Sequence, residues 1–343
     1  MRLRAGGGER CSRGADEAGG GAAGRACGAR AVAADDRGRR AVVHGLRGVP
    51  VVLRGRLARQ GRGHVGKDRV RPRMATLTIK PNERVTFRVM HEDDHVAVVS
   101  KPPGVVTMPG LGHDDDSLLN GMFAKWGPRL QNLGRARDFG LLHRLDRDTS
   151  GLVMVALTPG AYDALRRAFE KREVQKFYWA VCRSAPKRAT GVVRKPLEEF
   201  QGVMGEDTRT RKLCRIGSAG KEALTAFRVL SASRKGALLE CRPVTGRLHQ
   251  VRVHLASLGA AILGDDAYGP SEVRRAAPRL ALHAHRLAFT HPITGERIDV
   301  KSAWPADLRR LLLRLGLERP DLRKPVREEP SGGVERGHEV DDD

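Results

Sequence analysis

The 343-residue chain is predicted to have an α+β fold, and two observations lead to this prediction. Short segments with the apolar pattern of strands occur in pairs that are separated by turn residues. Segments with the spacing of amphipathic helices lie between these pairs, but strands and helices do not alternate regularly. Regular alternation would indicate a doubly wound parallel sheet, so the order of segments favours α+β.

The first predicted elements are two strands and a helix. Residues 85–90 and 95–100 are rich in valine, and an acidic turn separates them. Leucine, methionine and tryptophan at helical spacing predict a helix over residues 117–126. Asp116 or Ser117 would be its N-cap, because a short polar side chain can accept a hydrogen bond from the first helical turn.

The middle of the chain begins with a continuous apolar run over residues 152–157, which predicts a buried strand. Pro159 suits the first turn of a helix, and residues 161–171 have an amphipathic helical pattern. Three further strands are predicted, at residues 176–182, 223–230 and 237–242.

The last predicted elements are a helix over residues 250–258, which Gly259 would end, and two strands. The strands cover residues 281–290 and 297–301, and the Pro-Ile-Thr-Gly sequence at 292–295 is typical of the hairpin turn that would join them.

The formal net charge of +23 indicates a polyanionic partner, because lysine and arginine attract phosphate and release its counterions. The charge is unevenly distributed. Residues 1–73 carry 18 Lys and Arg against six Asp and Glu, a net +12, which leaves +11 for residues 74–343. The folded part is therefore expected to be only moderately basic.

Three regions are expected along the chain. Residues 1–73 contain no Phe, Trp, Tyr or Ile and are expected to be a disordered Gly/Ala/Arg-rich extension. This extension could bind RNA, target the protein to an organelle, or lie upstream of a true start at Met74. Residues 74–320 are expected to form one folded domain, and the charged, Pro/Gly-containing residues 321–343 a disordered tail.

The five cysteines form no C-x-x-C pair, so neither a zinc site nor a disulfide framework is predicted, and a reducing compartment is expected. No apolar stretch approaches the ~20 residues of a membrane span. A secretory signal pattern is also missing. A cytoplasmic location without membrane association is therefore expected, with an organelle as the alternative if residues 1–73 are a transit peptide.

Asp146 lies in a predicted loop just before the 152–157 strand, with Arg144 and Arg147 beside it. Nearby positive charge favours the ionised carboxylate, which could act as a nucleophile or a base toward a sugar carbon. The alternative is an ordinary loop aspartate that caps a turn or pairs with a surface arginine.

Two other segments could carry chemistry. Gly246 precedes a basic helix start, where free backbone amides favour phosphate. Arg247, Arg252 and His254 could contact RNA phosphates there, or Arg247 could pair with a buried carboxylate; an ordinary helix with a solvated basic face is equally possible. Tyr178 shares a strand face with Lys176, and packing is its usual role at such a position.

Metal and hydrolase sites are not indicated. Asp146 and Asp148 could bind Mg²⁺, but no Gly-rich phosphate loop accompanies them. Ser150 lacks the G-x-S-x-G elbow. Two histidine pairs lack the spacing or third ligand of a metal site and are expected to be structural: His249 with His254, and His283 with His285.

Taken in order, five sequence motifs resemble those of the RluA-type pseudouridine synthases, over roughly residues 85–310. The motifs are Lys101-Pro102-x-Gly104, His143-Arg144-Leu145-Asp146-x-x-Thr149-Ser150-Gly151-Leu152, Lys176-x-Tyr178, Gly246-Arg247-x-His249-Gln250-x-Arg252-x-His254, and Gly264-Asp265-x-x-Tyr268-Gly269. One such motif could arise by accident, but five in the right order would not.

The resemblance implies an RNA pseudouridine synthase, a mixed and largely antiparallel sheet with flanking helices, and a central RNA-binding cleft. It implies that Asp146 is the catalytic aspartate, Arg247 its basic partner, and Tyr178 the residue that packs against the target base. Arg144 would fill the gap left by a flipped nucleotide. Further contacts to the substrate would come from His143, Thr149, His249, Gln250 and Arg252.

The same resemblance implies a structured RNA substrate, rRNA or tRNA, with no metal and no small-molecule cofactor; a monomer is expected. Leu248 departs from the family, which usually has threonine there. Two other functions remain open: a noncatalytic RNA-binding protein of the same fold, and a hydrolase that would release free uracil.

Overall fold

The computed structural model describes residues 78–318, except residue 111 and residues 204–209. The expected extension 1–73 and the expected tail 321–343 lie outside the described residues, so the three-region division of the chain stays a prediction. No helix among the described residues is long and apolar enough to cross a lipid bilayer.

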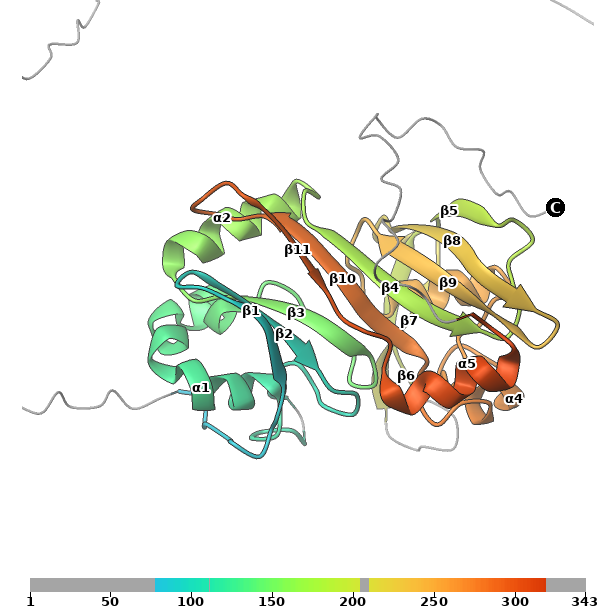
Figure 1. Cartoon of the computed structure of the whole chain (residues 1–343), viewed down its shortest axis with the longest axis horizontal. Coiled ribbons are helices and arrows are strands. Elements are labelled where there is room, and N and C mark those ends of the chain that lie inside the picture. The colour runs from blue at the N-terminus through green and yellow to red at the C-terminus, as the bar shows by residue number, and fades with distance from the viewer. Residues whose placement is uncertain (1–77, 111, 204–209, 319–343) are drawn as a thin grey trace, which may run out of the picture. The chain divides into compact units, whose positions relative to one another are not determined.

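The described part is organised around one twisted sheet with strand order β1-β2-β3-β10-β4-β9-β8-β5, in which β11 pairs with β10 (Figure 1). All neighbours are antiparallel except β3 and β10, which are parallel. The predicted α+β class is confirmed. The strands are β1 (Arg88–Glu92), β2 (Val96–Lys101), β3 (Ser150–Ala156), β4 (Gln175–Cys182), β5 (Thr190–Arg194), β8 (Leu224–Ser233), β9 (Gly236–Pro243), β10 (Leu282–Thr290) and β11 (Arg297–Lys301).

The helices lie outside the sheet, as predicted. Figure 1 shows α1 and α2 beside the β1–β3 half, and α4 and α5 at the other end. Their bounds are α1 (Leu118–Leu133), α2 (Pro159–Glu170), α3 (Gln250–Ser257), α4 (Ser271–Arg275) and α5 (Arg309–Leu315), with 3₁₀ turns η1 (Arg135–Gly140) and η2 (Ala306–Leu308).

The main core extends along the sheet from β2 and β3 to β4, β9 and β10, and it includes buried residues of α1, α2 and α5. Every residue of β3 is buried, which explains the uninterrupted apolar run in its sequence. Ser117 is the N-cap of α1 and forms a reciprocal capping box with Asn120. The prediction ended this helix at Trp126, but it continues to Leu133, because Trp126 leaves helical geometry (φ −123°) and the resulting kink accommodates Pro128.

Two strands form a separate antiparallel hairpin that the sequence did not predict: β6 (Leu197–Val203) and β7 (Thr210–Ile216). A small apolar cluster lies beneath this hairpin, with Leu197 and Cys214 at its centre and Leu248 packed against it. The leucine that departs from the family pattern therefore packs against the base of the hairpin.

Strand register places the loop before β3 next to β4. Gly151 pairs with Ala284 of β10, and Ala284 pairs with Tyr178 of β4. Gly151 has φ +118°, and a Cβ atom there would lie 2.2 Å from the carbonyl oxygen of Ala284. Only glycine allows the two strands to approach so closely, which brings the 143–149 loop beside Tyr178.

Candidate active site

All nine site residues named from the sequence line one pocket of about 920 Å³. They come from three separate parts of the fold: the loop before β3, strand β4, and the 246–252 segment that leads into α3. The residues are His143, Arg144, Asp146, Thr149, Tyr178, Arg247, His249, Gln250 and Arg252. The structure thus brings together residues that lie more than a hundred positions apart.

The main chain on both sides of Asp146 is fixed by the end of β2 and by the segment that follows it. The Thr107 hydroxyl donates to the carbonyl of Leu145 (2.8 Å) and accepts from its N–H (3.1 Å). The ammonium of Lys101, which is 1% exposed, donates to the carbonyl of Arg147 (2.9 Å), as does the N–H of Gly104 (2.9 Å). These contacts hold the backbone of the aspartate loop independently of any substrate.

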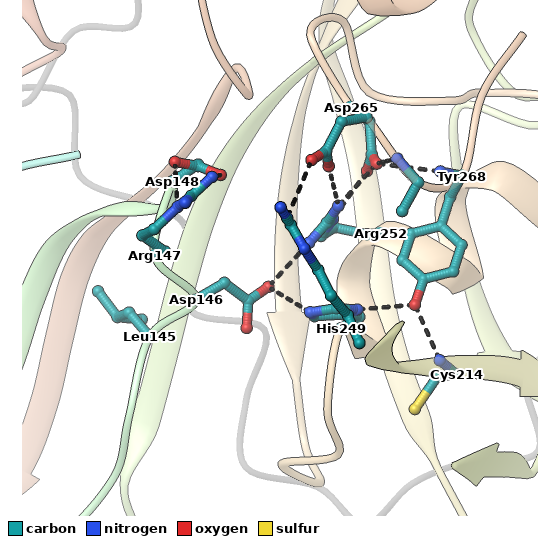
Figure 2. A network of polar contacts seen from close by, with 12 residues as sticks. Leu145, Asp146, Arg147, Asp148, Cys214, His249, Arg252, Asp265 and Tyr268 are labelled. Atoms are coloured by element: carbon teal, nitrogen blue, oxygen red, sulfur yellow. Dashed lines mark hydrogen bonds and ion pairs between the residues drawn. The ribbon is translucent and has the colours of Figure 1, made fainter. Parts of the chain in front are cut away.

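The carboxylate of Asp146 faces a cation. Its Oδ2 atom lies 3.5 Å from Nη1 of Arg252 and 3.9 Å from Nε2 of His249, while its side chain stays 22% exposed in the pocket (Figure 2). Arg252 is itself buried and bonded twice to the carboxylate of Asp265, at 2.8 Å from both Nε and Nη2. Nη2 also bonds Asp266 at 3.1 Å, so Nη1 is the guanidinium nitrogen left to face Asp146.

Burial and charge shift the pKa values of Asp265 and Arg252 in opposite directions. Burial would raise the pKa of Asp265, but Arg252 and the backbone N–H groups of Ala267 and Tyr268 lower it below its ordinary value. Burial alone would lower the pKa of Arg252, but Asp265 and then Asp146 raise it. The arginine is thus a permanent charge beside Asp146.

Arg247, the residue that the resemblance implied as the basic partner of Asp146, has different surroundings. It is exposed, lines the pocket, and donates from Nε to the main-chain oxygen of Glu222 at 3.0 Å. Arg252, expected at the substrate, is the arginine in ion-pair contact with Asp146.

Tyr178 and His143 form other parts of the pocket wall. Burial raises the pKa of Tyr178, and the charge of Asp146 raises it further, so its hydroxyl stays protonated at neutral pH. His143 accepts a hydrogen bond from the N–H of Met154 at 3.0 Å, and its ring lies 5.5 Å from that of Phe169. Burial lowers the pKa of His143 to about 3, which keeps this histidine neutral.

Three more of the named residues differ in exposure and in whether their polar atoms already have hydrogen-bond partners. Arg144 is exposed at the pocket. The buried hydroxyl of Thr149 has no hydrogen-bond partner among the described residues. The Gln250 amide, by contrast, is already engaged by protein groups: the hydroxyl of Thr245, the N–H of Arg247, and the carbonyl of Leu224 with the neighbouring threonine hydroxyl.

Sequence reasoning missed two members of this network, Asp265 and Tyr268. The Tyr268 hydroxyl lies 2.7 Å from Nδ1 of His249 and 2.9 Å from the N–H of Cys214 (Figure 2). Both residues belong to the Gly-Asp-x-x-Tyr-Gly motif, and that motif was the available signal, although nothing in its spacing assigned them a role. The described residues contain no group of three or more His, Cys, Asp or Glu that could hold a metal ion.

Comparisons with known proteins agree on one family. The family model described as RNA pseudouridylate synthase matches residues 95–257, which include Asp146, Tyr178 and Arg252. A Synechocystis protein called an uncharacterized RNA pseudouridine synthase is 33% identical over 234 residues, which cover 68% of this chain and 70% of the relative.

Two relatives have more specific names. "Ribosomal large subunit pseudouridine synthase D" of Zymomonas mobilis is 34% identical, covering 66% of this chain and 72% of the relative. The protein of the same name from Xanthomonas campestris is 36% identical, covering 70% and 72%.

A solved human structure, "RNA Pseudouridylate Synthase Domain Containing 4", superimposes with a TM-score of 0.53 at 27% identity, covering 68% of this chain and 94% of that chain. Its similarity confirms the predicted sheet-and-helix architecture. The chain belongs to the RNA pseudouridylate synthase family and is an RNA pseudouridine synthase, an isomerase that acts on RNA.

Proposed function

We propose that this enzyme isomerises uridines in large-subunit ribosomal RNA and that Asp146 performs the bond chemistry. The observation that carries the catalytic assignment is the ion-pair contact of Asp146 with Arg252 inside the pocket that also contains Tyr178. The contact with a permanent cation orients this carboxylate in the pocket, where it can act either as a nucleophile or as a base.

The bonds and protons that the reaction exchanges all belong to one nucleotide. The bond between ribose carbon 1′ and uracil nitrogen 1 breaks, the base rotates, and carbon 5 bonds to the sugar. Carbon 5 then loses its proton and nitrogen 1 gains one. Asp146 would act at the sugar, by attack or by removing the 2′ proton. Tyr178, whose hydroxyl stays protonated, would pack against the base, and Arg144 at the exposed side of the pocket would replace the flipped nucleotide in the RNA.

The ribosomal target rests on the relatives that bear that name, at 34 and 36% identity. Five exposed arginines and lysines of the pocket wall would face the phosphates around the target: Arg144, Arg166, Arg172, Lys212 and Arg247. The cytoplasm is the expected location, and the free, buried cysteines Cys182, Cys214 and Cys241 suit a reducing compartment.

Mapping of pseudouridines in total RNA from cells with and without the gene tests the target. We expect the loss of one or a few sites in large-subunit rRNA. Loss confined to tRNA would contradict the ribosomal assignment and leave the enzyme class intact.

Asp146→Asn tests the catalytic assignment, because it removes the charge and preserves the shape. The purified variant should lose pseudouridine formation by at least about a thousandfold while RNA binding persists. Asp148→Asn is the matched control: this carboxylate two residues away pairs with Arg147 at 3.3 Å and should tolerate the change. Undiminished activity of Asp146→Asn, or free uracil as the product of the wild type, would refute the mechanism.

A further inference from the structure

A chain of contacts runs from the β6–β7 hairpin to the carboxylate of Asp146. The backbone N–H of Cys214 in β7 donates to the Tyr268 hydroxyl, and that hydroxyl lies 2.7 Å from Nδ1 of His249. Nε2 on the other side of the same imidazole lies 3.9 Å from Oδ2 of Asp146. Figure 2 shows the histidine ring between the tyrosine and the aspartate.

These contacts determine which nitrogen of His249 carries the proton. The Tyr268 oxygen already accepts from an amide, and an amide N–H can only donate. The hydroxyl has one proton of its own, and Nδ1 of His249 is the acceptor within reach of it among the described residues. A neutral His249 therefore accepts at Nδ1 and carries its proton on Nε2, which faces Asp146.

Protonation of His249 would disturb this arrangement, because Nδ1–H and the Tyr268 hydroxyl proton would then compete for the same space. The charged groups around the imidazole are Asp146, Asp265 and Asp266, which favour protonation, and Arg252, which opposes it. Burial is the largest influence, and it lowers the pKa of His249. The neutral ring is thus the form that fits the pocket.

The backbone also holds His249 in place. It has φ 52° and ψ 18°, a left-handed conformation that a non-glycine residue adopts only when its surroundings enforce it. It stands immediately before α3, and its carbonyl accepts from the N–H of Val253 at 3.0 Å. The strained backbone aims the ring between Tyr268 and the carboxylate.

Arg252 and His249 both face the same oxygen of Asp146. Nη1 of Arg252 and Nε2 of His249 lie 3.5 and 3.9 Å from Oδ2, whereas no hydrogen bond to Oδ1 is found among the described residues. Two N–H groups that face one oxygen, the nearer of them at 3.5 Å, orient the carboxylate and leave the other oxygen to the pocket. Oδ1 is therefore the oxygen available to the nucleotide.

We propose that Tyr268 and His249 are positioning residues: Tyr268 fixes His249 as the Nε2–H tautomer, and His249 together with Arg252 holds Oδ2 of Asp146 so that Oδ1 meets the sugar. This proposal rests on the catalytic role of Asp146 proposed above. It also connects the hairpin to the reacting carboxylate, because the amide that orders the Tyr268 hydroxyl belongs to β7.

The first test is independent of activity. Full-length protein labelled with ¹⁵N-histidine should give a long-range ¹H–¹⁵N pattern for His249 with a protonated Nε2 and an unprotonated Nδ1, and His249→Gln assigns the signal by its disappearance. Tyr268→Phe should lose this single-tautomer pattern. A proton on Nδ1 in the wild type, or an unchanged pattern in Tyr268→Phe, would overturn the proposal even if Asp146 is catalytic.

The second test separates positioning from folding. Tyr268→Phe should lower the single-turnover rate about ten- to a hundredfold, with the Kd for RNA changed less than about twofold. Tyr162→Phe is the matched control, because the hydroxyl of this α2 residue donates to Asp138 of η1 (2.9 Å), outside the pocket wall. A wild-type rate in Tyr268→Phe would refute the role of its hydroxyl.

The third test compares two unbranched replacements of His249. Gln places an N–H near the position of Nε2, whereas Met fills similar space without a donor, and both bear the same backbone strain. His249→Gln should retain at least about ten times the rate of His249→Met. Equal rates would contradict the donor role of Nε2. Failure of Asp146→Asn to reduce activity would instead refute the proposed function, and the two failures are therefore distinguishable.

Discussion

At the scale of single residues, Arg247 and Arg252 belong to one sequence motif but have opposite surroundings. Arg247 precedes α3 and is exposed, whereas Arg252 lies within the helix, buried against Asp265. Sequence alone predicts that both are basic and close to each other. It cannot tell which one meets Asp146, because that depends on how α3 is oriented toward a loop 106 positions earlier in the chain.

The two arginines should respond differently to substitution. Arg247→Gln should weaken RNA binding, reduce the slope of log Kd against log salt by about one, and leave kcat nearly unchanged. Arg252→Lys should lower kcat, because lysine cannot bond Asp265 at two points and still reach Asp146. Salt titrations and single-turnover rates check both predictions. If Arg247→Gln lowered kcat and Arg252→Lys weakened RNA binding instead, Arg247 would be the basic partner of Asp146.

A second prediction at this scale concerns His283, which is 3% exposed and lies between the hydroxyls of Ser150 (2.9 Å) and Ser302 (3.1 Å). Burial first, then the neighbouring His285 and Arg279, lower the pKa of His283 to about 3. The unfolded chain protonates this histidine near pH 6.5, while the folded chain does not until about pH 3. The free energy of unfolding should therefore fall as the pH drops through this window.

The loss attributable to His283 is about 1.4 kcal/mol between pH 7.5 and 5.5. Urea unfolding at both pH values measures it, and His283→Gln should reduce the loss by about that amount. The same pH dependence in wild type and variant would show that His283 is not the group responsible.

At the scale of elements, the sequence predicts the strands and helices whose apolar residues face one core. The continuous run of β3 and the amphipathic pattern of α2 were both found close to their predicted bounds. The β6–β7 hairpin was missed because charged residues interrupt its pattern. Its strands are joined by contacts such as Lys212–Glu199 (3.3 Å) and Arg215–Glu198 (3.2 Å), which become visible only once the pairing is known.

The parallel pairing of β3 with β10 provides the test at this scale. Gly151→Ala would force Cβ against the carbonyl of Ala284 and strain a φ of +118°, at an expected cost of about 3 kcal/mol in the free energy of unfolding. Gly160→Ala in α2 is the matched control, since nothing lies within 4 Å of the added methyl group and alanine favours helices. Chemical denaturation compares the two, and equal stabilities would exclude close strand approach as the reason for Gly151.

At the scale of the whole molecule, the site depends on contacts between distant segments. The 143–149 loop, β4 and α3 meet through the sheet order, in which β10 lies between β3 and β4. Periodicity predicts elements but not their neighbours, so local patterns left Asp146 between a catalytic and an ordinary role. The five motifs in their order resemble those of a family, and this resemblance predicts that the residues meet in one site. No single residue could predict that.

The uneven charge gives a prediction for the full chain. Residues 1–73 carry a net +12 but lie outside the residues matched by the family model. A variant that begins at Met74 should keep its single-turnover rate within about twofold, while binding to nonspecific RNA weakens and its salt slope decreases. Filter binding at several salt concentrations and rate measurements check this. A collapse of the rate would mean that the extension takes part in the reaction.

The contacts around Asp146 have a consequence for how such an enzyme could acquire new targets. Thr107 and Lys101 bond main-chain atoms of Leu145 and Arg147, and main-chain atoms are the same whatever side chain a residue carries. The side chains of Arg144 and Arg147 can therefore change without moving the carboxylate between them. Recognition of RNA around the reacting uridine could diverge, or be redesigned, while the chemistry stays the same.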